Sequence, residues 1–385
     1  MDGTNAKLAS LESLRGLLAL WVLVAHVAAR VISEGSILRF HARAPLEPLL
    51  PVYVFMALSG FVIFHLLERQ RERYGAFLLR RFFRLAPLYF VVLLVAAWMQ
   101  PFELRTLDNL FWRNAHIYDA IKIHHEALTL FWAHLWPHLL LLQGLVPDTL
   151  LPDANFTFLN QGWSISLEWQ FYLLAPLAFW LAARRRYLGL GLLAAALAGL
   201  SLTGYPSVGF LPNQFVWFAL GIASFYVWRH GHWFARLDPR THDLLLPALG
   251  VLLFLLLHDP WPVLVWLLVL DVILAERAGL ETKITLALRR VLELPLLQWL
   301  GRISYSIYLV HIGVLYVVLR AITRFDEHLG GWKVLALALP ATLLLTLLVS
   351  ALTYRWIEVP GMALGRALGK RFTAPRTSPA PLTTA

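Results

Sequence analysis

The sequence predicts an all-α polytopic integral membrane protein with about ten transmembrane helices and both termini in the cytoplasm. Of its 385 residues, 59% are hydrophobic and only 15% are charged, and the mean hydropathy is +0.65. A soluble domain with a single core does not need so much apolar sequence, whereas a set of membrane spans does. The basic residues gather in short segments between apolar runs, which is typical of cytoplasmic loops.

The first apolar run, residues 12–32, carries Arg15 near its start and His26 well inside it. Eleven residues are close to three helical turns, so the two side chains face the same way, about 16 Å apart along the helix axis. An ionisable side chain in a membrane span is costly and is therefore a candidate functional residue that faces the bundle interior. The alternative is structural: Arg15 anchors the helix beside Glu12, and His26 is a hydrogen-bonded core histidine.

A second apolar run covers residues 50–67, and a third covers residues 85–100. The segment between them, residues 68–84, holds six arginines. By the positive-inside rule this segment is cytoplasmic, which places the N-terminus of the chain inside as well.

The region 101–163 is expected to be a long outer loop. An apolar element near residues 126–146 is interrupted by His134, Pro137 and His138. If this element crossed the membrane, the arginines that follow the next span would lie outside, against the positive-inside rule. We therefore expect a re-entrant or interfacial element rather than a span.

The remaining apolar runs complete the ten predicted spans, and they place every later basic loop on the cytoplasmic side. They cover about residues 165–183, 187–203, 211–229, 243–258, 261–276, 301–320 and 333–354. The transmembrane domain is thus expected over residues 1–360. Residues 361–385 are expected to form a cytoplasmic basic segment that ends in a disordered tail.

The composition also limits the chemistry. The net charge of +10 is accounted for by cytoplasmic loops, so no nucleic-acid partner is expected; the partner is the lipid bilayer. The chain has no cysteine, which removes disulfides, thiolate metal sites and a cysteine nucleophile. His134 and His138 are four residues apart, but no third ligand falls at a recognisable interval, so no metal site is predicted.

Two arginines mark the inner end of the third span. Arg81 and Arg84 are three residues apart and share a helix face, where their guanidinium groups could bind phosphate oxygens. The alternative interpretation is a topology signal in contact with lipid headgroups.

The fourth span opens with a polar and aromatic sequence, residues 162–176. Glu168 lies about one turn into this helix, close to Trp163, Ser164 and Tyr172. An acid there can form the wall of a polar cavity, or it can simply be stabilised by the helix N-terminus. The sequence does not decide between these interpretations.

The ninth span begins at residues 301–313 and places Ser304, Tyr308 and His311 on one face. Such a polar stripe is typical either of a functional site or of contacts between transmembrane helices.

Several short sequences follow one another along the chain. They are Arg15 and His26 in the first span, FMALSGF at 55–61, RRFFRLAPLY at 80–89, WSISLEWQFYLLAP at 163–176, LGRISYSIYLVH at 300–311 and YRWIEVPG at 354–361. In this order the chain resembles membrane acyltransferase family 3, integral-membrane O-acyltransferases that modify bacterial surface polysaccharides, peptidoglycan, glucans and some small molecules. The resemblance also implies ten spans with cytoplasmic termini.

The resemblance implies a donor and an acceptor on opposite sides of the bacterial inner membrane. Acyl-coenzyme A, with acetyl the commonest acyl group of the family, would bind from the cytoplasm with its phosphates near Arg15, Arg81 and Arg84. Its pantetheine arm would reach His26, which would act as general base on a hydroxyl of an extracytoplasmic glycan or related acceptor. Acyl-coenzyme A is a co-substrate here, and no permanently bound cofactor is expected.

The other site residues would support this reaction. Glu168 would orient the imidazole or hold the acceptor, and His311 with Tyr308 would donate hydrogen bonds to the developing oxyanion. A covalent acyl-enzyme carried by Ser59 or Ser164 is a less favoured route. The competing class is a proton-coupled transporter or polysaccharide-precursor flippase, in which His26, Glu168 and His311 would relay protons.

Overall fold

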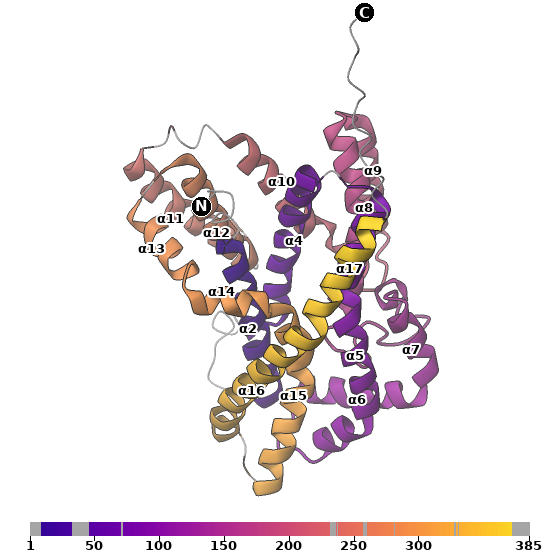
Figure 1. Cartoon of the computed structure of the whole chain (residues 1–385). Helices are drawn as coiled ribbons and strands as arrows, with labels where there is room; N and C mark the ends of the chain where they lie inside the picture. Colours follow the sequence, from indigo (N-terminus) through magenta and orange to yellow (C-terminus); the bar gives the residue numbers. More distant parts are fainter. Residues whose placement is uncertain are drawn as a thin grey trace, which may run out of the picture.

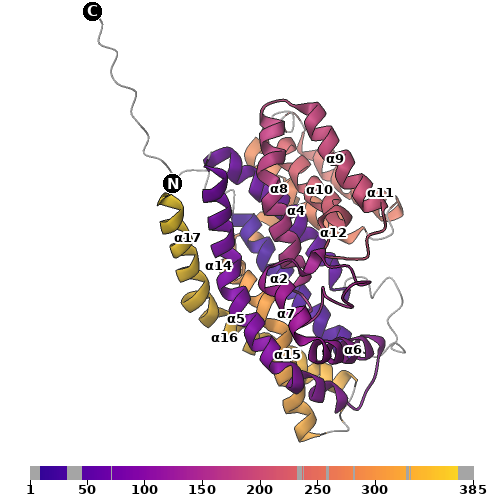
Figure 2. The ribbon, with the colours of Figure 1, turned by 90° about the vertical axis from the view of Figure 1, so that its right-hand side faces the viewer.

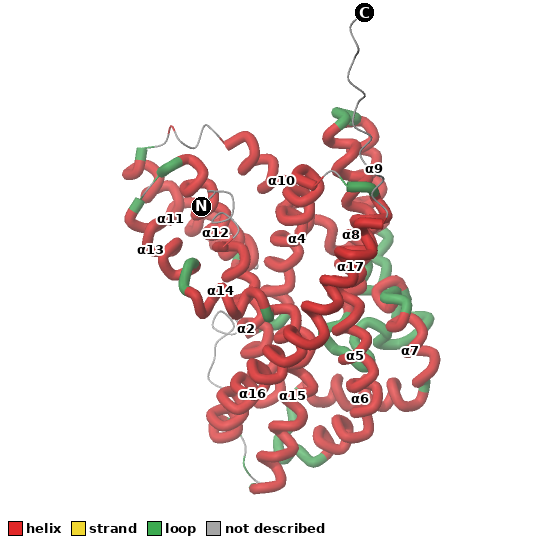
Figure 3. Tube along the Cα trace, viewed as in Figure 1, coloured by secondary structure: helices red, strands yellow, loops and turns green. Residues whose placement is uncertain are grey.

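The computed structural model describes residues 9–32, 46–70, 72–231, 236, 238–256, 260–280, 282–326, 329 and 331–371. In this part of the chain all regular structure is helical, as predicted, and no strand occurs (Figure 3). The expected tail at residues 373–385 lies outside the described residues.

Each of the ten predicted spans coincides with a helix. These helices are α2 (Ala9–Val31), α4 (Leu49–Gln70), α5 (Tyr74–Asp108), α8 (Trp163–Ala183), α9 (Tyr187–Leu202), α10 (Leu211–His230), α11 (Pro239–Leu256), α12 (Trp261–Ala278), α15 (Ser304–Phe325) and α16 (Trp332–Thr353). Among the described residues, six helices are long and apolar enough to cross a membrane. They are α2, α4, α5, α8, α15 and the continuous helix Trp332–Lys370, of which α16 is the first part. The total of ten spans and the orientation of the termini stay predictions.

Shorter helices connect and extend the bundle. They are α6 (Ala115–Thr129), α7 (Phe131–Leu139), η2 (Gln143–Leu145), α13 (Lys283–Leu292), α14 (Pro295–Arg302), the π-helical segment η4 (Tyr354–Glu358) and α17 (Val359–Arg371). The apolar element predicted near residues 126–146 forms the end of α6, then α7 and η2. The nine residues of α7 extend about 14 Å, which is too short for a membrane span of about 30 Å.

Glycines allow the helices that carry the site to approach closely. A Cβ atom at Gly60 of α4 would lie 2.2 Å from the carbonyl oxygen of Phe218, and one at Gly221 of α10 would lie 1.8 Å from that of Ala57. The same holds for α2 and α14, where a Cβ at Gly301 would lie 2.0 Å from the carbonyl oxygen of Glu12. Small residues are the usual means of tight helix packing in membranes.

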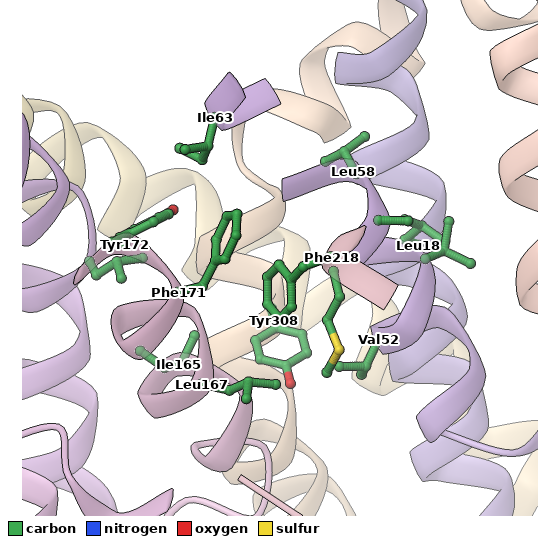
Figure 4. Packing of buried hydrophobic residues seen from close by; sticks show 14 of the residues in the cluster. Leu18, Val52, Leu58, Ile63, Ile165, Leu167, Phe171, Tyr172, Phe218 and Tyr308 are labelled. Atoms are coloured by element: carbon green, nitrogen blue, oxygen red, sulfur yellow. The ribbon is translucent and has the colours of Figure 1, made fainter. Parts of the chain in front are cut away.

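The centre of the bundle is filled by aromatic side chains. Phe171 of α8 and Phe218 of α10 stack with ring centroids 4.2 Å apart, close to Tyr308 of α15 (Figure 4). On the other side of the bundle, α17 runs beside α5 (Figures 1 and 2), where Gly361 packs against Pro87 and Gly365 against Phe83. These contacts hold α5 and its arginines between the core and the C-terminal helix.

Candidate functional site

A cavity of about 300 Å³ lies between α2, α4, α5, α8 and α15. We call it the arginine cavity. It brings together nine of the residues predicted from sequence: Arg15, Ser59, Arg81, Arg84, Ser164, Glu168, Tyr172, Ser304 and Tyr308. The two segments that supply most of them, on α5 and α8, are far apart in the chain and meet because α8 packs against both α4 and α5.

Arg84 is held by an acid that the sequence analysis did not single out. Its guanidinium forms an ion pair with Glu358 of η4, whose second carboxylate oxygen accepts a hydrogen bond of 2.9 Å from the Ser306 hydroxyl. The side chain of Glu358 is fully buried. A π-helical segment widens the turn that carries this acid, and such segments are frequent at functional sites.

Arg81 is less constrained than Arg84. The Nε atom of Arg81 is buried and has no hydrogen-bond partner among the described residues, and the guanidinium lies 6.0 Å from the centroid of the Phe77 ring. Its charge interacts with Glu168 and Tyr172 in the same cavity. Arg81 therefore has donor capacity left for a bound anion.

Arg15 fits both of its interpretations. It forms a 3.5 Å ion pair with Glu12, as the structural alternative requires, and it also lines the arginine cavity. The pair is partly exposed, so it holds Arg15 weakly and leaves the guanidinium able to exchange partners.

Glu168 belongs to the arginine cavity. Its Oε1 accepts hydrogen bonds from the hydroxyls of Tyr172 and Ser59, the latter at 3.4 Å. Of the two roles expected for Glu168, orienting the imidazole of His26 does not match this geometry, because His26 lines a different cavity and contacts another histidine. The other role, holding the acceptor, stays a prediction.

The second cavity, which we call the outer cavity, has a volume of about 320 Å³. It lies between α2, α6 and the chain that leads into α8. This is the end of the bundle opposite the arginine-rich segments 68–84 and 184–186, which we call the arginine loops (Figure 1). It is lined by both apolar and charged side chains: His26, Ala29, Arg30, Glu47, Pro48, Leu49, Val52, His116, Asp119, Ala120, Lys122, Ile123, Asp153, Phe156, Asn160, Gln161, Trp163 and Tyr308. Among them, Lys122 donates a 2.8 Å hydrogen bond to Asp153, which raises the pKa of the Lys122 ammonium group.

The hydrogen bonds of two histidines define their tautomers. Nδ1 of His311 lies 2.8 Å from the carbonyl oxygen of Tyr308, and Nδ1 of His26 lies 2.9 Å from that of Val22. A carbonyl oxygen only accepts, so each Nδ1 carries the proton. Nε2 of the neutral His311 is then an acceptor, and it lies 3.3 Å from Nδ1 of His26. This arrangement leaves Nε2 as the basic nitrogen of His26.

The role expected for His311 changes accordingly. A neutral His311 with Nδ1–H bonded to a carbonyl and Nε2 facing His26 has no proton to donate to an oxyanion. Its geometry is instead that of a residue that orients the imidazole of His26, the role that had been expected of Glu168.

Tyr308 connects the two cavities. Its ring and Val52 line both of them. The Tyr308 hydroxyl lies 2.7 Å from Oγ of Ser164 and 3.1 Å from the carbonyl oxygen of Gln161. The hydroxyls of Ser59 and Ser164 therefore have hydrogen-bond partners other than histidine, Glu168 for Ser59 and Tyr308 for Ser164.

Two functional candidates were missed from sequence. Glu358 lies in the motif YRWIEVPG, and an acid buried at the end of a predicted span was the available signal. Arg30 is one turn beyond His26, is buried, lines the outer cavity and donates a 2.8 Å hydrogen bond to the carbonyl oxygen of His116. Its position at the end of the first predicted span does not by itself distinguish it from an interfacial anchor.

No cluster of three or more His, Asp or Glu side chains that could hold a metal ion occurs in the part of the chain that the structure describes. Both cavities are lined by a mixture of charged, polar and apolar side chains, which suits organic substrates.

Comparison with known proteins identifies the class. The chain matches acyltransferase family 3, described as "Acyltransferase domain", over residues 8–355, and it belongs to this family. The resemblance deduced from the motifs is thus confirmed, and the apolar helices indicate a multi-pass membrane acyltransferase. The chain is similar to the acyltransferase MdmB of Streptomyces mycarofaciens, with 26% identity over an alignment of 409 residues that covers 98% of this chain and 96% of the relative. No solved structure gives a significant match.

Proposed function

We propose that the protein transfers an acyl group from cytoplasmic acyl-coenzyme A to a hydroxyl of an extracytoplasmic glycan or related acceptor. The observation that supports this proposal best is the pair of adjoining cavities, one lined by three arginines and the other by His26, with Tyr308 in the wall of both. A donor with phosphates and an acceptor with a hydroxyl would each find a suitable environment, and their reacting atoms would meet beside Tyr308.

The donor is held by its phosphates. Arg81 has unused donor capacity, while Glu358 fixes the position of Arg84 and Glu12 loosely holds Arg15. Guanidinium groups bind phosphate oxygens through paired, charge-assisted hydrogen bonds. With the charged part of acyl-coenzyme A at this end, the pantetheine arm extends toward His26, about 16 Å further along α2 than Arg15.

The chemistry follows from the tautomer of His26. Nε2 takes the proton of the acceptor hydroxyl as its oxygen attacks the thioester carbonyl carbon, and the carbon–sulfur bond then breaks. The thiolate of coenzyme A receives the same proton from Nε2, so the ester and the free thiol leave and the enzyme is unchanged. His311 accepts the hydrogen bond from Nδ1–H of His26, which holds the ring in place and stabilises the imidazolium that forms.

Direct transfer is favoured over an acyl-serine intermediate. A serine nucleophile needs a base within hydrogen-bond reach, and the hydroxyl of Ser59 faces Glu168 while that of Ser164 faces Tyr308. A carboxylate already bonded to Tyr172 is a poor base for this purpose.

A sided assay tests the proposal. The protein is reconstituted in liposomes, with radiolabelled acetyl-coenzyme A on the face that carries the arginine loops and a hydroxyl acceptor on the other. Protein orientation is determined by protease access to the loop after α8. We expect labelled ester only on the acceptor side, and only when the two substrates are on opposite sides. Acceptor that crosses the membrane without being acylated would instead support transport.

Family membership leaves the acceptor and the acyl group open. Acetyl-coenzyme A is the donor to test first, in the membrane of a bacterial host, because acetyl is the commonest acyl group of the family. The arginine cavity would bind only the coenzyme A end of the donor, which all acyl-coenzyme A molecules share, so it would not select the acyl group. Longer acyl groups are then compared at equal concentration, and the preferred one is the one with the highest kcat/KM.

A further inference from the structure

A hollow larger than both substrate cavities lies elsewhere in the bundle. It is a groove of about 1490 Å³ at the end of the bundle that carries the arginine loops, between α4, α5, α8, α9 and α10. It shares no lining residue with the arginine cavity or the outer cavity. Pockets for small ligands usually measure about 300–1000 Å³, so this groove suits a larger molecule.

One wall of the groove is an apolar face of α8. Leu173, Leu177 and Trp180 follow the i, i+4, i+7 spacing of one helix face, and their exposed fractions are 40%, 47% and 41%. Pro176 and Phe179 extend this wall. The exposed apolar strip runs along a predicted span, where hydrocarbon chains are the natural partner.

The end of the groove is positively charged. Arg184 and Arg185, in the turn between α8 and α9, line it and are exposed, and neither has an acidic partner within ion-pair distance among the described residues. The guanidinium of Arg186, in the same turn, lies 4.5 Å from the centroid of the Trp180 ring on the apolar wall. The first turn of α9, at Tyr187, adds the positive end of a helix dipole to the same place.

The other charges of the groove are already neutralised. Arg229 forms a 2.9 Å ion pair with Glu68, and Glu72 pairs with Arg80. The groove therefore has two surplus positive charges at one end and a hydrocarbon-like wall along its length. A molecule that complements both parts has one anionic head and at least one long apolar chain.

We propose that this groove binds an anionic phospholipid of the inner leaflet, with its phosphate and headgroup at Arg184 and Arg185 and an acyl chain along Leu173, Leu177 and Trp180. The bound lipid fills the space between α8, α9 and α10. This site is separate from acyl transfer, and the proposal does not depend on the proposed reaction.

Native mass spectrometry of the protein released from nanodiscs tests the proposal. The nanodiscs contain equal parts of phosphatidylglycerol and phosphatidylcholine, and the probe is retained phosphatidylglycerol. We expect wild type to retain phosphatidylglycerol preferentially. The double variant Arg184→Gln/Arg185→Gln should reduce its retention about 25-fold, at about fivefold for each arginine near an anionic surface.

Two further variants make the test specific. Arg290→Gln/Arg366→Gln removes the same charge from exposed positions outside the groove and should leave retention unchanged. Leu177→Trp keeps both arginines but fills the apolar wall, and it should lower retention of the lipid. Equal retention of both lipids by wild type would overturn the proposal. So would an equal loss in the Arg290 and Arg366 control, or displacement of the lipid signal by glycerol phosphate alone, which would indicate a site for a free phosphate ester.

Discussion

Nε2 of His311 lies 3.3 Å from Nδ1 of His26, and the two imidazole rings are inclined by 55° with centroids 5.0 Å apart. The two histidines are 285 positions apart in the sequence, on α15 and α2. Because the backbone carbonyls of α15 fix the proton of His311, this contact also fixes the proton of His26. A basic nitrogen at a defined position is what a general base requires.

The first prediction concerns His311 as a positioning residue. His311→Ala should lower kcat about 100-fold with little change in KM, because a misplaced base costs about two orders of magnitude while substrate binding elsewhere is kept. His311→Gln should recover part of kcat, since its amide oxygen can accept the hydrogen bond from Nδ1–H of His26. If His311→Ala raised KM and left kcat unchanged, His311 would be a substrate-binding residue instead.

The second prediction separates two neighbouring arginines. Arg81→Gln should weaken binding of acyl-coenzyme A about 10-fold to 100-fold, as expected for loss of a charge-assisted hydrogen bond. Arg80→Gln is the matched control, because Arg80 pairs with Glu72 and does not line the arginine cavity. Isothermal titration of both variants measures the difference. Equal weakening in both would mean a general charge effect rather than a phosphate site at Arg81.

The third prediction concerns the ion pair between Arg84 and Glu358. Glu358→Gln leaves the guanidinium of Arg84 without its counter-charge, which should lower stability by about 3 kcal/mol. Thermal unfolding in detergent measures this loss. The double variant Arg84→Met/Glu358→Leu should recover most of the stability but not the binding of acyl-coenzyme A. Unchanged stability in Glu358→Gln would show that the pair does not hold α5 to η4.

The fourth prediction concerns pH. Burial lowers the pKa of His134 and of His138 to about 4. Below pH 6.5 these histidines bind protons in the unfolded chain but stay neutral in the folded chain. Stability is therefore lost as the pH falls from 6.5 toward 4, by up to about 3 kcal/mol for each histidine.

His134→Leu should reduce this acid sensitivity, because neither ring nitrogen of His134 has a partner among the described residues. Unfolding followed from pH 7 to pH 4.5 checks it. The exposed His125→Gln is the control, and an unchanged slope in His134→Leu would refute the assignment.

Much of the fold could be predicted from the sequence, because hydropathy is a local property. Each predicted span falls on a helix, whereas the re-entrant or interfacial element expected near residues 126–146 from the charge of the later loops stays a prediction. The grouping of Arg81, Arg84 and Glu168 in one cavity was foreseen only in part. It depends on the packing of α8 against both α4 and α5, which no local pattern predicts.

The partners of the site residues could not be predicted. Glu358 and Arg84 are separated by 274 positions, and the helix faces that meet depend on close glycine contacts such as that of Gly60 with Phe218. Sequence spacing placed Tyr308 and His311 on one face of a helix, but it did not indicate that His311 would contact His26. For this reason the orienting role expected of Glu168 is proposed for His311 instead.

The central claim is that His26 is the general base and that Arg15 belongs to the donor site. Its most direct test is the turnover and binding of acetyl-coenzyme A by purified wild type, His26→Ala and Arg15→Ala in nanodiscs, with a hydroxyl acceptor present. We predict that His26→Ala binds the donor normally and loses at least about 100-fold in turnover, while Arg15→Ala mainly weakens donor binding. If His26→Ala turns over the thioester as fast as wild type, His26 is not the base and the account is wrong.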